Sequence, residues 1–101
     1  MAEHAVIVRF AYGLGSTDPL FGLEKQLSAA IDETVGKFDG NEIALDLSNG
    51  SLYMYGPDAD VLFGVIQPIL TSAPFMKGAT VVLRYGPPGK GVPERRVTIG
   101  E

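Results

Sequence analysis

The stretch Asn41–Tyr55, NEIALDLSNGSLYMY, is typical of two short strands joined by a turn at Asn49 and Gly50. An Asn-Gly pair supplies the two positive-φ positions that a type I′ hairpin turn requires. A two-residue turn also fixes which residues lie opposite each other. The predicted opposite pairs are Leu47 with Leu52, Leu45 with Met54, Asp46 with Tyr53 and Ala44 with Tyr55. One face of the hairpin is then aliphatic and suited to a core, and the other carries two tyrosines and an acid.

Strand-like segments lie further out on both sides of the hairpin. Ala5–Tyr12 and Ala79–Tyr85 alternate between their two faces, as half-buried strands do. Between the first of these and the hairpin, Asp18 offers an N-cap followed by Pro19, so a helix is predicted to begin there and to run to about Lys37. Its apolar stripe has spacings of three or four and consists of Leu20, Leu23, Leu27, Ile31, Val35 and Phe38.

A second helix is predicted between the hairpin and the last of these strands. Asp58 is placed to cap its first turn, and its inward apolar residues run from Leu62 to Leu70. Pro68 removes a backbone donor and crowds the carbonyl of Gly64. We therefore expect a kink or a break in this helix at the proline.

The C-terminal part of the chain is rich in proline and glycine. Residues 86–94, GPPGKGVPE, predict a loop, and Arg95–Ile99 predicts a short fifth strand that folds back on the fourth. Lys90 adds to the positive charge of Arg95 and Arg96, so a partner-docking loop is an alternative interpretation. A long hairpin connection needs the same residues, and this structural interpretation is favoured.

The order of these elements resembles the split βαβ, or ferredoxin-like, plait, βαββαβ. The predicted fold class is α+β, with an antiparallel sheet in the order 4-1-3-2, both helices on one face and the fifth strand beside the fourth. A chain of 101 residues fits a single domain, residues 1–101.

In this arrangement the two helices cover one face of the sheet and leave the other open. The predicted core residues of the sheet are Val6, Val8, Phe10, Ile43, Leu45, Leu47, Leu52, Met54, Val81 and Leu83. The predicted open face carries Ile7, Arg9, Ala44, Asp46, Tyr53, Tyr55, Val82 and Arg84. Tyrosine and arginine contribute much of the energy of protein interfaces. The candidate binding residues are therefore Arg9, Asp46, Tyr53, Tyr55 and Arg84.

Composition limits the chemistry that the chain can perform. It has no cysteine, which excludes disulfides and thiolate nucleophiles and fits a reducing compartment. No apolar run approaches the roughly 20 residues that span a bilayer, and the N-terminus lacks the features of a signal peptide, so we expect a cytoplasmic protein without membrane contact. No metal-ligand cluster or cofactor motif stands out. The only histidine, His4, is expected to be a surface residue.

Nucleic acid is not an expected partner. The net charge is −4, and the basic residues are scattered apart from Arg95 and Arg96. RNA-binding proteins of this topology stack bases on aromatic residues of the first and third strands. Here Tyr53 and Tyr55 lie on the third strand, but the outward first-strand positions hold Ile7 and Arg9.

Residues 49–57 followed by a helix resemble the middle section of acylphosphatases. That family carries a catalytic arginine at the end of a phosphate loop, whereas the corresponding segment here, YGLGSTDPLFG, contains none. The asparagine expected near the end of the second strand is also missing. The resemblance therefore does not predict acylphosphatase activity.

A well-patterned core without a catalytic constellation favours a small non-enzymatic module that binds a protein partner or itself through the open face. Apolar residues beside paired charges on that face are the motivation for a homodimer. The alternative is a small ligand sensor or enzyme whose pocket is completed at a dimer interface, with Arg9, Tyr53, Tyr55 and Arg84 orienting the ligand.

Overall fold

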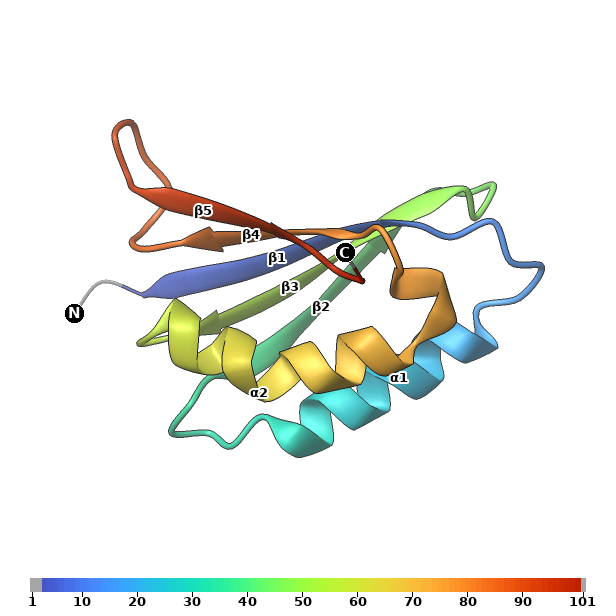
Figure 1. Cartoon of the computed structure of the whole chain (residues 1–101), viewed down its shortest axis with the longest axis horizontal. Helices are drawn as coiled ribbons and strands as arrows, with labels where there is room; N and C mark the ends of the chain where they lie inside the picture. Colours follow the sequence, from blue (N-terminus) through green and yellow to red (C-terminus); the bar gives the residue numbers. More distant parts are fainter. Residues whose placement is uncertain (1–2, 101) are drawn as a thin grey trace.

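The protein has two α-helices packed on one face of a five-stranded antiparallel sheet, as the computed structural model shows (Figure 1). The structure describes residues 3–100. Its elements are β1 (His4–Ala11), α1 (Asp18–Ala30), β2 (Lys37–Ile43), β3 (Asn49–Gly56), α2 (Ala59–Ser72), the 3₁₀ turn η1 (Pro74–Met76), β4 (Thr80–Arg84) and β5 (Glu94–Thr98). Across these residues, neither helix has the length and apolar character of a membrane span.

The sheet has the order β2-β3-β1-β4-β5, so the first strand of the chain lies at its centre. β1 pairs with β3 on one side and with β4 on the other, and all neighbouring strands are antiparallel. The α+β class is confirmed, and β5 pairs with β4 as predicted. The two free edges of the sheet belong to β2 and β5.

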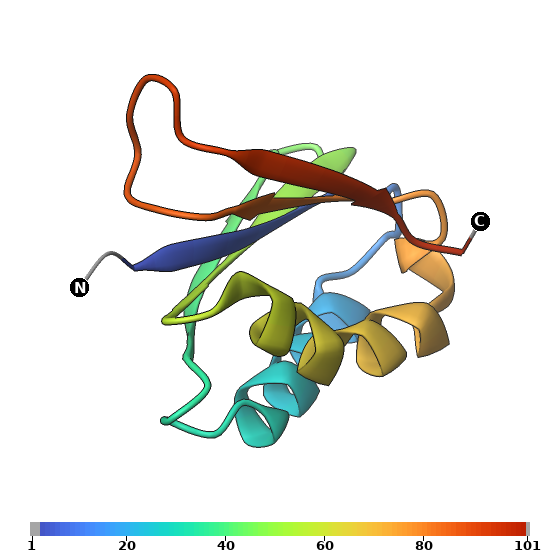
Figure 2. The ribbon, with the colours of Figure 1, turned by 60° about the vertical axis from the view of Figure 1, so that its left-hand side comes forward.

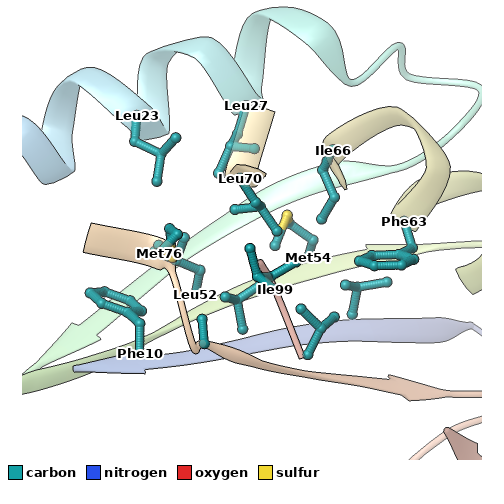
Figure 3. Close-up of a cluster of buried hydrophobic side chains, with 14 of the residues drawn as sticks. Phe10, Leu23, Leu27, Leu52, Met54, Phe63, Ile66, Leu70, Met76 and Ile99 are labelled. Carbon is teal, nitrogen blue, oxygen red and sulfur yellow. The ribbon is translucent and has the colours of Figure 1, made fainter. Parts of the chain in front are cut away.

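The core lies between the helices and the inner face of the sheet (Figure 3). Side chains of α1 and α2 point toward β1 and β3, and Met76 of η1 and Ile99, which follows β5, belong to the same cluster. The helical residues that are almost fully buried are Leu20, Leu23, Leu27, Leu62, Phe63, Ile66 and Leu70. Burial of one such side chain contributes roughly 1.5–3 kcal/mol relative to its exposure, so this cluster is the main source of stability.

Helix α2 begins as predicted but is not broken by its proline. The carboxylate of Asp58 accepts hydrogen bonds from the amides of Asp60 (2.9 Å) and Val61 (3.3 Å). The helix then continues through Pro68 to Ser72, so of the predicted kink or break the break is wrong, and the kink stays a prediction. Pro68 is exposed, while Ile66 and Leu70 on either side are buried, and their packing keeps the helix intact across the proline.

Helix α1 ends earlier than its apolar spacing predicts. It stops at Ala30, where the amide of Ile31 still bonds to the carbonyl of Leu27 at 3.0 Å. The carboxylate of Asp32 then accepts a hydrogen bond from the amide of Thr34 at 2.8 Å, a local bond that competes with helix continuation. The chain therefore enters β2 at Lys37, where the sequence predicted the end of the helix.

The turn of the hairpin lies before Asn49 and Gly50 instead of at these residues. Ala44–Ser48 connects β2 to β3, closed by hydrogen bonds from the amide of Ala44 to the carbonyl of Asn49 (2.9 Å) and from the amide of Leu47 to the carbonyl of Ala44 (2.8 Å). Leu47 takes a positive φ of 61°. The predicted type I′ turn and its four opposite pairs are therefore wrong.

The ring of Phe10 explains why Gly50 belongs to the strand. Phe10 lies directly opposite Gly50, and a Cβ at position 50 would come within 2.9 Å of both the Phe10 ring and the carbonyl oxygen of Glu42. The glycine thus provides space for an aromatic ring instead of a turn conformation. One result is that Leu45, predicted to be in the core, lies in the turn and is 105% exposed.

We predict that Gly50→Ala lowers the free energy of unfolding by about 2 kcal/mol through steric overlap. Because part of that overlap is with the Phe10 ring, the cost should shrink by about 1 kcal/mol in a Phe10→Leu background. Urea denaturation of the four proteins of this cycle measures the coupling. Gly15→Ala is the matched control and should leave stability unchanged, since a Cβ there meets nothing within 4 Å. A type I′ turn at Gly50 would instead give no coupling to Phe10.

Candidate binding face on the open side of the sheet

Figure 2 shows that the helices lie on one side of the sheet only; the other side is called the open face below. Three rows of side chains form this face. Directly opposite residues point to the same side of a sheet, so the pairing defines the rows. The first row, from β2 to β5, is Lys37, Tyr55, Ala5, Arg84 and Glu94. The second is Gly40, Tyr53, Ile7, Val82 and Arg96, with Asp39 beside Gly40 in a bulge, and the third is Glu42, Ser51, Arg9, Thr80 and Thr98.

The centre of the open face is apolar but shielded. Ala5, Ile7 and Val82 are only 0%, 8% and 7% exposed, although neither helix covers this side of the sheet. Tyr53 and Tyr55 pack against them and are themselves half-buried. A partner would therefore meet tyrosine rings and arginine side chains first, and the small aliphatic residues form the layer beneath them.

Tyr53 carries a polar contact at the β2 side of the face. Its hydroxyl donates a hydrogen bond to the carboxylate of Glu42 on the neighbouring strand. This bond raises the pKa of Tyr53, and the positive charge of Arg9 opposes the increase. The hydrogen bond thus links the side chains of β2 and β3, and Arg9 acts on Tyr53 through its charge.

Arg84 is held at the β4 side of the face. Its Nε donates to the carbonyl of Gly86 at 2.9 Å, and the side chain is half-buried. On the opposite edge, Lys37 and Asp39 form an exposed ion pair at 4.0 Å. Both edges of the face therefore carry charges. From the first row to the second, the β2 edge has Lys37 and then Asp39, whereas the β5 edge has Glu94 and then Arg96.

Four of the five candidate residues lie on the open face as predicted, namely Arg9, Tyr53, Tyr55 and Arg84. The predicted position of Asp46 is wrong, because it lies in the turn between β2 and β3 together with Ala44. Its carboxylate accepts a hydrogen bond from the amide of Ser48 at 3.0 Å. Hydrogen bonds from Ser48 also lower the pKa of Asp46, so this carboxylate stabilises the turn.

The sequence did not reveal the charged residues at the β2 edge of the face. Lys37 was assigned to the end of the first helix, and Asp39 and Glu42 were given no role. The alternation of charged and apolar residues in Lys37-Phe38-Asp39 was a signal for a strand, but Phe38 also fitted the helical spacing. Glu94 and Arg96 lie at the edge formed by β5.

His4 has a structural contact that the sequence did not predict. Its Nδ1 accepts a hydrogen bond from the amide of Ala59 at 3.1 Å, and its ring meets that of Tyr85 edge-on at 5.6 Å. The histidine therefore helps to cap α2 and is half-buried. In residues 3–100, no group of three or more His, Cys, Asp or Glu side chains could hold a metal ion.

No protein-family model matches the chain, and neither a curated protein nor a solved structure is significantly similar to it. The open face consists of two tyrosines packed over small aliphatic residues, with charged side chains at both edges. Tyrosine and arginine in such a setting are suited to recognition of another surface.

We predict that Glu42→Gln lowers the pKa of Tyr53 toward that of an ordinary tyrosine, because it removes the charged acceptor. In the native protein the raised pKa means that this bond stabilises the fold fully below about pH 10, and the contribution is lost as the pH rises through the folded pKa. Titration of the tyrosine Cζ signals by NMR measures the change. The pKa of Tyr85, which is raised by its bond to Asp60, should not move in this variant. An unchanged Tyr53 titration would contradict the contact.

Proposed function

We propose that this protein is a non-enzymatic, cytoplasmic binding module of ferredoxin-like fold and that its open face binds a second copy of the same chain. The observation that carries the proposal is the complementary character of the two halves of this face. In the first two rows, residues at equal distances from β1, on the β3 side and on the β4 side, are matched partners in charge or in shape. A surface of this kind is self-complementary when a two-fold axis relates two copies.

In the proposed dimer, the open faces of two sheets are stacked on each other. The two-fold axis lies between the two sheets and runs parallel to β1, and this orientation brings the matched residues together. A rotation about it places β2 of one copy over β5 of the second and β3 over β4. Lys37 then faces Glu94 of the second copy, and Asp39 faces Arg96 of the second copy. Each pair occurs twice by symmetry, so four ion pairs surround the interface.

The same rotation matches the inner strands. Tyr55 lies over Arg84 of the second copy, in position for a cation–π contact, and Tyr53 lies over Val82 of the second copy. Ala5, Ile7 and Arg9 lie on the axis, so each meets its own counterpart. The two Arg9 charges repel each other, and the ion pairs at the rim offset this repulsion. Tyrosine and arginine at the centre with ion pairs at the rim is the usual arrangement of a specific interface.

The size of the open face sets the expected strength of this association. Strands lie about 4.8 Å apart and rise about 3.3 Å per residue, so the three rows span roughly 19 Å across the five strands and roughly 13 Å along them. Stacked sheets are turned by about 30° because of their twist, and the long side chains of Lys37, Arg96 and Glu94 span the resulting offset at the edges. An interface of this extent is smaller than those of stable complexes and corresponds to a weak, transient association. Dimerisation should therefore depend on protein concentration.

We predict that the double variant Tyr53→Ala, Tyr55→Ala weakens the dimer about 100-fold, because two central rings are lost on each copy. Sedimentation equilibrium over a range of concentrations measures the dissociation constant. The matched control is Phe21→Ala, which removes an exposed ring (49%) from α1, on the other side of the molecule, and should leave the dimer unchanged. A wild-type protein that stays monomeric at millimolar concentration would refute self-association.

We further predict that Lys37→Glu and Glu94→Lys each weaken the dimer about tenfold, and that their combination in one chain restores it. The combination rebuilds the pair with its charges exchanged only if residue 37 faces residue 94. Rescue of Lys37→Glu by Glu42→Lys instead would place the axis across the strands, since Glu42 lies at the other end of the same edge. That result would overturn the axis along β1 while leaving self-association intact.

A further inference from the structure

A cleft of about 730 Å³ lies on the helix side of the sheet, away from the open face. It is bounded by the loop after β1, the first turns of α1 and the segment from the end of α2 through η1. Small-molecule sites typically have volumes of roughly 300–1,000 Å³. The cleft is thus large enough for a ligand with the size of a metabolite.

Aromatic and aliphatic side chains form most of its wall. The rings of Tyr12 and Phe75 meet edge-on with centroids 5.2 Å apart, and Leu14 at the rim is 38% exposed. The Tyr12 hydroxyl donates to the carbonyl of Ser16 and accepts from the amide of Leu20 at 3.3 Å. Because this residue ties the loop to α1, the wall is already formed without a ligand.

The fold does not require a glycine at position 22. It lies inside α1, where glycine is a poor helix former compared with alanine. A Cβ at this position would meet nothing within 4 Å, and its φ is not in the positive region where a side chain would be strained. Gly64, inside α2, differs because its carbonyl faces the ring of Pro68. Gly22 lines the cleft, so its missing side chain leaves room there.

The polar residues of the cleft indicate the charge of its ligand. Among the described residues that line it, Lys77 is the only charged one, and Tyr12, Gln26 and Ser72 carry the other polar side-chain groups. The Tyr12 hydroxyl is already engaged with Ser16 and Leu20. A single ammonium group beside an apolar wall is complementary to one negatively charged group on an apolar body.

We propose that this cleft binds a small amphipathic carboxylic acid, whose apolar body lies against Tyr12 and Phe75 and over Gly22 and whose carboxylate pairs with Lys77. The site is separate from the open face, so it requires neither a dimer nor the proposed axis.

Two probes of equal shape test the assignment, namely 2-naphthoate and its neutral amide, 2-naphthamide. Binding to the full-length protein is measured by titration of its amide NMR signals. We expect 2-naphthoate to shift the signals of residues around the cleft and to bind about fivefold more tightly than the amide. Lys77→Gln should remove that difference without changing the affinity for the amide. Equal affinity of the two probes for the wild type would refute the carboxylate pairing.

Variants at Gly22 test the space in the cleft. Gly22→Leu should weaken both probes about tenfold by filling the site. Gly22→Ala should raise Tm by about 4 °C as a better helix former and still weaken binding, a combination that loss of structure cannot produce. Gly64→Ala, outside the cleft, should leave binding unchanged. Wild-type affinity in Gly22→Leu, or signal shifts confined to the open face, would overturn the proposal.

Discussion

Phe10 of β1 lies over Gly50 of β3, and this contact locks the register of the central pair of strands. Successive side chains of a strand point to opposite faces, so a slip by one residue would exchange the two faces completely. The contact keeps Val6, Val8 and Phe10 toward the helices and Ala5, Ile7 and Arg9 on the open face. Because β1 also pairs with β4, the same register extends across most of the sheet.

The parts of the fold that local signals encode could be predicted from the sequence. Alternation identified β1 and β4, and the position of Asp58 identified the start of α2, because each pattern lies within one element. The turn could not be predicted in this way. Asn49-Gly50 has the local signature of a turn, but the ring of Phe10, about 40 positions away in the chain, requires the glycine in the strand. Phe38 fitted a helical stripe as well as a strand, and only the early end of α1 decides between them.

The same distinction applies to the candidate site. Arg9, Tyr53, Tyr55 and Arg84 were placed on the correct face because that placement depends only on alternation within strands that were predicted correctly. Asp46 failed because its placement depended on the turn. The charged residues of β2 lie on the open face because of the register in which β2 pairs with β3, and the sequence did not predict that register. These residues supply part of the complementarity on which the proposed dimer depends.

The open face and the cleft lie on opposite sides of the sheet and involve different residues of β1 and of the loop after it. The open face uses the residues of β1 that point away from the helices, whereas the cleft lies beyond its end, where Tyr12 contacts the start of α1. A dimer stacked through the open face would leave the helices, and therefore a cleft in each copy, on the outside. Association and ligand binding could then occur together in one assembly.

Chemical crosslinking between two copies tests the proposed dimer most directly. Because the sequence has no cysteine, only an introduced cysteine can react with the crosslinker. Arg9 lies on the axis along β1, and stacked sheets are about 10 Å apart, so a short bifunctional maleimide should join two copies of an Arg9→Cys variant. Thr98 lies two strands away, so two copies of it would be about 19 Å apart laterally and, with the spacing of the sheets, about 22 Å apart in all. We expect efficient covalent dimers from Arg9→Cys and few from Thr98→Cys. Equal crosslinking of the two variants, or none in either, would contradict the arrangement.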